Sequence, residues 1–397
     1  MTLEGGACTI ARWNKRARSS GRVGLGPLCD KIANHMRIDQ LTAGFAEGDA
    51  ISGIAIELQK LFRSWGHASE IYAMPQFTSA RMRGRCMDYR EHRNSADPRD
   101  IMVFHFSIGG ELVEFFRNLK CRKVLIYHNI TPPEYYAAID PAAAKRLEEG
   151  YAKLESLRDC VDLALADSEF NKSGLVAAGY PNVEVVPPLI DFGLLDQEPD
   201  ADVLRKHGDM STKILFVGRL VPNKKLEDVI KVFYFYQKTV NPQSRLLLIG
   251  SYAREGRYYS YLRGLVTELK MVADVRDVVF AGHVTFRELL AYYRLADVFL
   301  CMSEHEGFCI PLLEAMHFEI PIIAYRSSAV PETLGGASVV VNDKQPETIA
   351  EMIHEAVENR AFREKIIAQQ NRRLSDFRRE KICDVVRARM RPLMERG

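Results

Sequence analysis

The chain has 397 residues, of which 47% are hydrophobic and 27% are charged, and its formal net charge is +2. This length accommodates two domains with complete cores, and the nearly balanced charge argues against a general attraction to nucleic acid. No apolar run approaches the roughly 20 residues of a membrane-spanning helix. The eight cysteines are scattered without a C-x-x-C pair, which favours reduced thiols in a cytoplasmic protein over a disulfide framework or a zinc site.

Residues 1–35 differ in composition from the rest of the chain. They are rich in glycine and in basic residues, show neither a helical nor a strand period, and lack the apolar core of a secretory signal. We predict a poorly ordered extension ahead of a natural start at Met36. A basic arm that contacts a membrane is the alternative interpretation.

From residue 37 onward, apolar runs of strand length alternate with segments of helical period. In the first half, the predicted strands cover residues 37–43, 68–73, 101–106, 123–127, 163–166 and 183–186. Helices are predicted for residues 50–64, 110–118 and 141–159, and another begins at the capping pair Asp167-Ser168. An Arg-rich loop is predicted for residues 79–100. This alternation is typical of a parallel sheet with helices on both faces.

Pro187-Pro188 interrupts the alternation, which then restarts. In the second half, the predicted strands cover residues 213–217, 246–249, 278–280, 298–300, 322–324 and 338–341. The tail is helical and increasingly basic. We therefore predict the following parts: the extension (1–35), an N-terminal domain (36–188), an interdomain connector without a clear period (189–210), a C-terminal domain (211–375) and a basic C-terminal helix (376–397).

The segment after the fourth strand of the second half has the strongest local pattern. An apolar run at residues 298–302 leads through a polar loop containing Gly307 into a helix that begins near Pro311, where a missing N–H costs nothing. Such a junction binds anions, because free N–H groups and the positive end of the helix dipole face the strand's carboxyl end. Glu306 and Glu314 bracket the turn, so a ligand with both phosphate and hydroxyls, such as a nucleotide sugar, would suit it. For Glu314 alone, an ordinary acidic residue near a helix N-terminus explains the sequence equally well.

A second motif, Gly218-Arg219-x4-Lys224, follows the predicted strand 213–217. Glycine lets the chain turn sharply near a ligand. Two cations at the end of a strand suit a diphosphate leaving group, whose negative charge grows as the sugar–oxygen bond breaks. By itself the motif would be interpreted as a solvated basic loop, with Lys225 as the solvent-facing neighbour.

These two motifs resemble a known family. The setting S-E-x-E-G-F-x-x-P-x-x-E-A-M around Glu306 and Glu314, together with G-R-L-x-x-x-K at residues 218–224, is similar to the signature of the family-4 retaining glycosyltransferases. The resemblance covers roughly residues 36–375 and is more specific in the second half. It implies the GT-B architecture, in which two Rossmann-like domains with parallel sheets face one another across a cleft that holds the ligand.

The resemblance also implies roles for individual residues. Glu306 and the amides after it would bind the donor sugar, amides at the helix start the distal phosphate, and Glu314 the ribose. Arg219 and Lys224 would bind the pyrophosphate. The backbone positions implied in donor binding are Gly218, Gly307, Phe308, Cys309, Ile310, Leu312 and Leu313. The family usually has a small residue, often glycine, where this chain has Cys309, but a backbone amide can serve there with any side chain.

In the first half, His128 ends the strand 123–127, and the resemblance implies a contact with the donor sugar; a structural, hydrogen-bonded histidine is the alternative. His105, near the end of the preceding strand, is a weaker candidate for the acceptor site. Gly48 lies in a glycine-bearing loop that would bring backbone close to the donor phosphate and the acceptor. Asp49 either caps the next helix or meets the acceptor. Val284 would lie near the nucleotide base through its backbone.

Together these features predict a retaining hexosyltransferase that moves a sugar from a nucleotide-sugar donor to a glycan or lipid-linked acceptor, in cell-surface polysaccharide biosynthesis. No residue is an obvious nucleophile, which favours front-face attack assisted by the leaving phosphate. No cofactor or metal is expected, because Arg219 and Lys224 take the place of a divalent ion. The D-x-D match at Asp200-Ala201-Asp202 lies in the connector and is interpreted as chance. The absence of a Walker A motif argues against an NTPase.

Two alternatives stay open: a nucleotide-sugar epimerase or hydrolase on the same fold, and a nucleotide-sugar-binding protein without turnover. Contact with an anionic membrane is a further prediction, based on the basic tail after Arg372 and on Arg81, Arg83 and Arg85. A solvated basic face explains these residues equally well. We expect a cytoplasmic location, with peripheral contact at the inner face of the cell membrane, and no nucleic-acid partner. The sequence does not name the sugar, the base, the acceptor or the oligomeric state.

Overall fold

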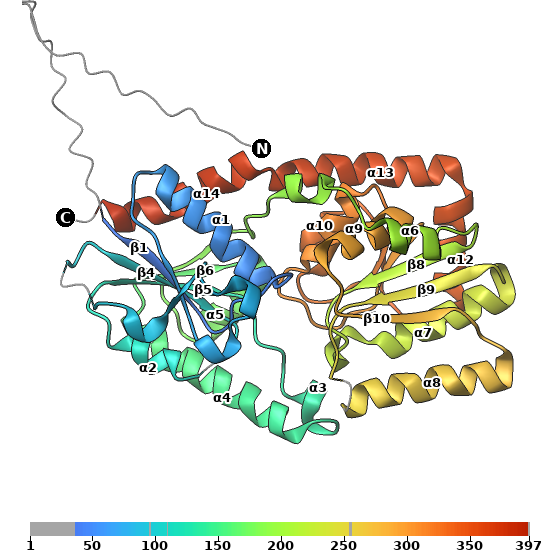
Figure 1. Ribbon diagram of the computed structural model, residues 1–397, viewed down its shortest axis with the longest axis horizontal. Coiled ribbons are helices and arrows are strands. Elements are labelled where there is room, and N and C mark those ends of the chain that lie inside the picture. Colours follow the sequence, from blue (N-terminus) through green and yellow to red (C-terminus); the bar gives the residue numbers. More distant parts are fainter. Residues whose placement is uncertain (1–35, 95–96, 109, 254–255, 396–397) are drawn as a thin grey trace, which may run out of the picture. The chain divides into compact units, whose positions relative to one another are not determined.

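The computed structural model describes residues 36–94, 97–108, 110–253 and 256–395 (Figure 1). The prediction for residues 1–35 therefore lies outside the described residues. The chain from Met36 onward forms one compact unit. Within the described ranges, no helix is both long enough and apolar enough to cross a membrane.

Seven parallel strands form the N-terminal sheet of the described chain, in the order β3-β2-β1-β4-β5-β6-β7. The strands are β1 (Ile38–Thr42), β2 (Ile71–Ala73), β3 (Met87–Asp88), β4 (Ile101–Phe106), β5 (Arg122–Tyr127), β6 (Leu163–Ala166) and β7 (Val183–Val185). Both faces are covered, because Ile38 of β1 packs in one core with helix α1 (Ala50–Ser64) while Leu41 packs in another with α2 (Leu112–Arg117) and α4 (Pro141–Leu157). In Figure 1, α1 lies on one side of this sheet and α2 and α4 lie on the other.

The C-terminal sheet contains six parallel strands among the described residues, in the order β10-β9-β8-β11-β12-β13. The strands are β8 (Thr212–Val217), β9 (Ser244–Ile249), β10 (Val278–Gly282), β11 (Val298–Cys301), β12 (Ile322–Tyr325) and β13 (Val339–Val341). One face carries α7 (Leu226–Phe235), α8 (Arg257–Ala273) and α12 (Pro346–Glu358). The other face carries α9 (Phe286–Leu295) and α10 (Ile310–His317). The predicted α/β class with two parallel sheets is confirmed.

The connector region contains more structure than we predicted. Residues 192–196 form a 3₁₀ turn, and α6 (Ala201–His207) is a two-turn helix that is too short to show a period in the sequence. Asp200 caps α6, because its carboxylate accepts from the backbone N–H groups of Asp202 at 2.9 Å and Val203 at 3.0 Å. The first aspartate of the D-x-D match therefore has a local structural role.

The basic C-terminal helix returns to the N-terminal sheet. After α13 (Arg360–Leu374), α14 (Arg379–Met394) packs a buried apolar face into the same core as α1 (Figure 1). Arg379 pairs with Glu57 of α1 at 3.3 Å, and Arg122 of β5 donates to the Leu393 carbonyl at 2.6 Å. α14 is thus amphipathic, and its basic residue Arg379 forms an ion pair within the molecule.

The strand order of each sheet creates a crevice where the chain changes direction. The reversal lies between β1 and β4 in the N-terminal sheet and between β8 and β11 in the C-terminal sheet. Loops after these strands diverge at the carboxyl edge, which is where parallel α/β sheets bind ligands. The motifs after β8 and β11 stand at one of these two crevices.

Candidate active site

At the crevice of the C-terminal sheet, an ion pair joins the two sequence motifs. Lys224 Nζ lies 2.5 Å from Glu306 Oε2, and the Glu306 side chain is only 7% exposed. Burial favours a neutral amine, but the attraction and hydrogen bond of the Glu306 carboxylate together with the neighbouring Cys309 and Cys301 raise the pKa of Lys224 above its ordinary value. Lys224 is therefore an ammonium at neutral pH, and a ligand phosphate could compete with Glu306 for it.

Arg219 supplies a second cation at the same edge. It follows Gly218 at the end of β8, its side chain is exposed, and no ion pair joins it to another residue in the described ranges. The turn before it is closely packed, since a Cβ placed on Gly250 would lie 1.9 Å from the Gly218 carbonyl oxygen. Glycine at the end of β9 thus lets the two strand ends approach and leaves Arg219 open to a ligand.

The helix α10 begins beside the ion pair. Cys309 occupies its N-cap position with a left-handed backbone (φ 72°), and Pro311 stands in the first turn. Leu312 and Leu313 on the buried face anchor the helix in the core. The Leu312 N–H donates to the Cys309 carbonyl at 3.0 Å, and anion binding by the amides of this turn stays a prediction.

Glu314, one turn into α10, is partly buried and accepts a hydrogen bond of 2.6 Å from the hydroxyl of the buried Tyr293. Burial raises the pKa of Glu314, while the Tyr293 hydroxyl works against this shift. The carboxylate is oriented by one partner and retains acceptor capacity for a ligand hydroxyl.

In the N-terminal domain, a polar chain crosses the carboxyl ends of four neighbouring strands. The nitrogen Nδ1 of His128 lies 2.8 Å from Asp167 Oδ2, and His128 Nε2 lies 2.9 Å from Nδ1 of His105. His105 Nε2 lies 2.9 Å from Gln40 Oε1, whose amide nitrogen donates to the Ala55 carbonyl at 2.9 Å. The strand order β1-β4-β5-β6 brings these residues together.

The hydrogen-bond partners in this row of side chains indicate which nitrogen atoms carry protons. Burial, and then the neighbouring His128, hold the pKa of His105 well below its ordinary value, so His105 is neutral. Because Gln40 Oε1 can only accept, His105 donates from Nε2 and accepts at Nδ1 from His128 Nε2–H.

These contacts bear on three expectations about the first half. His105 is buried with both ring nitrogens occupied, one of them by His128, so an acceptor contact by His105 stays a prediction. The His128 side chain is only 4% exposed and also uses both nitrogens, so its contact with a donor sugar stays a prediction. Asp49 caps α1 by accepting from Ser52 N at 2.9 Å, and an acceptor contact by Asp49 likewise stays a prediction.

A comparison with known protein families finds one that matches the part of the chain holding both motifs. Residues 201–373, which contain β8 to β13 and both motifs, match the family model described as "Glycosyl transferases group 1". The C-terminal part of the chain is thus similar to this family. The matched segment holds the Lys224–Glu306 pair and the α10 N-terminus.

Curated relatives are similar over a large part of the chain. One is the GDP-mannose-dependent alpha-(1-6)-phosphatidylinositol monomannoside mannosyltransferase of Mycobacterium tuberculosis, 29% identical over 52% of this chain and 55% of the relative. Another is the O-antigen chain mannosyltransferase B of Escherichia coli, 25% identical over 61% of this chain and 63% of the relative. The chain thus spans little more than half the length of the curated relatives it matches.

Solved structures share the whole fold. Sucrose-phosphate synthase from Thermosynechococcus elongatus has a TM-score of 0.69 with 17% identity and covers 91% of this chain and 100% of its own. HepE of Anabaena, solved in complex with UDP and glucose, has a TM-score of 0.69 with 15% identity and covers 90% of this chain and 100% of its own. At these identities the likeness shows the fold alone, and it agrees with the GT-B arrangement.

The C-terminal domain contacts the N-terminal domain partly through residues that the motifs did not reveal. Asn129 Nδ2 donates to His305 Nε2 at 2.8 Å, and the hydroxyl of Ser168 donates to the Gly307 carbonyl at 2.7 Å. The carboxylate of Glu332 accepts from the Glu169 backbone N–H at 2.8 Å, at the positive end of helix α5 (Glu169–Ala177). Gly307 is a predicted site residue, whereas Asn129, His305 and Glu332 are not, although Asn129 and His305 adjoin predicted site residues.

The N-terminal glycine loop also approaches the C-terminal domain. Gly48 has a left-handed backbone (φ 71°), and a Cβ placed there would lie 3.9 Å from Cε1 of His283. Val284 follows His283 and is partly buried against the core. The structure therefore brings Gly48 close to the segment expected to contact the nucleotide base, while the binding roles of Gly48 and Val284 stay predictions.

Replacing Gly307 by alanine should disturb the contact between the domains. The added Cβ would lie 2.7 Å from Asn129 Cβ and 3.0 Å from Asn171 Nδ2, and such overpacking typically costs about 1–3 kcal/mol. We expect a lower melting temperature and lower turnover. Gly264→Ala on α8 is the matched control, because a Cβ there meets nothing within 4 Å. Equal behaviour of the two variants would show that the contact at Gly307 is not required.

Proposed function

We propose that this protein is a retaining hexosyltransferase that moves a sugar from a nucleotide-sugar donor to a glycan or lipid-linked acceptor in cell-surface polysaccharide synthesis. The observation that carries the proposal is the Lys224–Glu306 ion pair at the N-terminus of α10, at the crevice of a parallel sheet. The mannosyltransferase names of the curated relatives support it.

In the proposed reaction, the donor diphosphate lies against Arg219, Lys224 and the α10 amides. Fixed positive groups there stabilise the negative charge that develops on the leaving phosphate. Glu306 accepts from hydroxyls of the sugar and Glu314 from those of the ribose. The acceptor hydroxyl attacks from the face of the departing phosphate, which takes up the acceptor's proton, so that the configuration at the anomeric carbon is retained.

A panel of nucleotide sugars tests this proposal. The curated relatives are named for GDP-mannose, whereas the HepE structures contain UDP and UDP-glucose, so both donors belong in the panel. The donor that raises the melting temperature most identifies the bound ligand, because a ligand of the native state stabilises it by mass action. Transfer with retained anomeric configuration, followed by NMR, is expected. Hydrolysis or epimerisation would overturn the proposal in favour of an epimerase or hydrolase, and binding without turnover in favour of a binding protein.

Turnover should survive treatment with EDTA. Arg219 and Lys224 stand where a divalent ion would otherwise neutralise the diphosphate, and Asp200 is occupied in capping α6. Initial rates measured before and after chelation, with Mg²⁺ or Mn²⁺ restored as a control, check this expectation. Activity that disappears with EDTA and returns with either ion would contradict it and bring Asp200 and Asp202 back into consideration.

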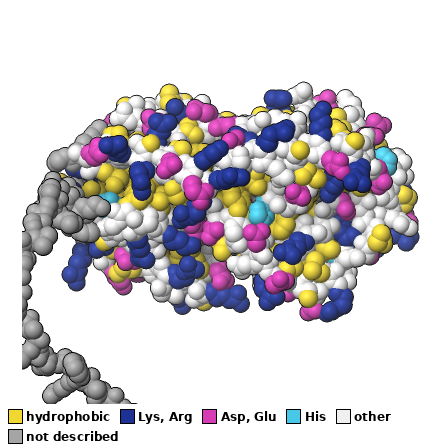
Figure 2. Space-filling model, turned by 90° about the horizontal axis from the view of Figure 1, so that it is seen from above, with side chains coloured by type: hydrophobic (Ala, Val, Ile, Leu, Met, Phe, Trp, Pro, Cys, Tyr) yellow, Lys and Arg dark blue, Asp and Glu magenta, His cyan; other side chains and the backbone are white. Residues whose placement is uncertain are grey.

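The protein should bind anionic vesicles in a salt-dependent manner. Phe77 is 62% exposed and lies close in sequence to the exposed Arg81, Arg83 and Arg85, and each cation near such a surface contributes about 1 kcal/mol. The face in Figure 2 mixes basic and acidic side chains, so a solvated surface is the competing explanation. Flotation at low and physiological salt separates the two, and absence of salt-dependent binding would exclude an electrostatic membrane role.

Two triple variants sharpen the flotation experiment. The test variant replaces Arg81, Arg83 and Arg85 by glutamine. The matched control replaces three exposed cations of the C-terminal domain, Arg263, Lys270 and Arg276. Both variants lose the same formal charge, so a selective loss of flotation in the test variant locates the contact in the N-terminal domain.

A further inference from the structure

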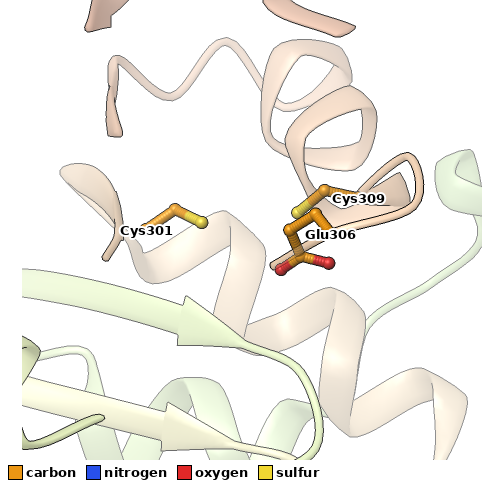
Figure 3. Close-up of side chains that lie close together, drawn as sticks. All are labelled: Cys301, Glu306 and Cys309. Carbon is orange, nitrogen blue, oxygen red and sulfur yellow. The ribbon is translucent and has the colours of Figure 1, made fainter. Parts of the chain in front are cut away.

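Two thiols lie directly beside the Lys224–Glu306 pair. Cys301 ends β11 and is 1% exposed, while Cys309 is the N-cap residue of α10. One sulfur atom from each and one carboxylate oxygen of Glu306 all lie within 4.8 Å of one another. Figure 3 shows the two sulfur atoms directed toward each other, with the Glu306 carboxylate next to Cys309.

The backbone at Cys309 makes this arrangement unexpected. Its φ of 72° lies in the left-handed region, which glycine adopts readily and a residue with a Cβ adopts at a cost. Glycine would satisfy the helix N-terminus and leave its amide unchanged. The chain instead carries a thiol at this left-handed position, within reach of a second thiol and a carboxylate.

The donor set has the chemistry of a thiophilic metal site. Two thiolates and a carboxylate are ligands of Zn²⁺ and Cd²⁺, whereas Mg²⁺ and Mn²⁺ prefer sites made only of oxygen. In a tetrahedral site with Zn–S bonds of about 2.3 Å, the sulfur atoms lie about 3.8 Å apart. The three ligand atoms already lie within 4.8 Å of one another, which is close to this spacing.

Charge and access also suit a divalent cation. When the ion binds, each thiol releases one proton to solvent and becomes a thiolate. Two thiolates, the Glu306 carboxylate, the Lys224 ammonium and one divalent ion then sum to zero charge. Cys309 is partly exposed and the Lys224 side chain is 19% exposed, so the ion can enter from the side of the cleft.

We propose that Cys301, Cys309 and Glu306 form a regulatory site for a thiophilic divalent cation of the Zn²⁺ class. Because Glu306 cannot serve the metal and the donor sugar equally well, occupancy of the site weakens donor binding. Only this inhibitory consequence rests on the proposed function; the metal site itself does not. The proposal is compatible with turnover that needs no metal, since removal of the ion would release the enzyme from inhibition.

The reduced, metal-free full chain, titrated with Cd²⁺ in the absence of any nucleotide, tests the site directly. We expect one equivalent to produce the ultraviolet thiolate-to-cadmium absorption band, and Zn²⁺ to displace Cd²⁺ and abolish the band. Cys309→Gly, which also relieves the backbone strain, should weaken metal binding at least about tenfold, as loss of metal-site residues commonly does. Cys383→Ser is the matched control, because it removes a partly exposed thiol on α14 far along the chain.

Each outcome of these experiments either supports the metal site or overturns it. No stoichiometric band, a band that survives in Cys309→Gly, or equal loss in Cys383→Ser would overturn the site. The melting temperature of each variant without metal shows whether it is folded, and Cys301→Ser provides a second test at the other sulfur. Calorimetry with the nucleotide sugar, with and without Zn²⁺, tests regulation: affinity should fall in the wild type and stay constant in Cys309→Gly. Unchanged affinity in the wild type would overturn the regulatory part, whether or not transfer activity is found.

Discussion

Arg219→Ala and Lys224→Ala should each lower turnover by about 10²–10³-fold, as removal of a charge-stabilising donor typically does. Both cations stand at the carboxyl edge of the C-terminal sheet, where a donor diphosphate would leave. Since the negative charge grows in the transition state, kcat should fall more than the affinity for the nucleotide. Steady-state kinetics together with calorimetry on each variant measure the two effects separately. A loss confined to KM would show that these cations bind the donor without assisting its cleavage.

The two substitutions differ in their expected effect on stability. Arg219 is exposed, so its removal should leave the melting temperature nearly unchanged. Removing Lys224 leaves the buried Glu306 carboxylate without its partner at 2.5 Å, and breaking a buried pair costs about 3–5 kcal/mol. The Lys224→Ala/Glu306→Gln double variant should regain part of this stability without regaining turnover. Lys231→Ala on α7, an exposed cation away from the cleft, is the control for general charge effects.

The sequence predicted those parts of the fold that local patterns determine. β4 and β6 match their predicted bounds because strands buried on both faces are continuous apolar runs. α1 matches because its apolar residues recur at helical spacing after the Asp49 cap. The two-residue β3 and the seven-residue α6 are too short to show a period in the sequence. β3 forms by pairing with β2.

The sequence predicted only those site residues that lie in a local motif. Lys224 and Glu306 each follow a strand of the same sheet, so two local motifs sufficed to place both at one edge. Asn129 and His305 are 176 residues apart and meet only because the two domains are in contact. The hydrogen bonds that join Gln40, His105 and His128 form because β1, β4 and β5 are neighbours in the sheet. No local sequence pattern reveals the order of strands in a sheet.

Glu306→Gln and Glu314→Gln should separate recognition of the sugar from recognition of the nucleotide. A hydrogen bond to a charged group contributes about 1.5–3 kcal/mol, so each substitution should weaken its ligand by roughly 10- to 150-fold. Glu306→Gln keeps the side-chain shape and should impair the nucleotide sugar while leaving the bare nucleoside diphosphate nearly unaffected. Glu314→Gln should weaken both ligands, because the ribose is common to them.

Parallel calorimetry with nucleotide and nucleotide sugar on wild type and both variants tests this division. Measurements at several pH values control for the protonation of Glu314, because burial raises the pKa of Glu314. Tyr293→Phe is an independent check: it removes the 2.6 Å hydrogen bond that orients Glu314 and should therefore weaken both ligands in the same sense as Glu314→Gln, by a smaller factor. If the Glu306 and Glu314 variants lose affinity for the two ligands equally, the assignment of sugar to one carboxylate and ribose to the other is wrong, even though the family of the domain would stand.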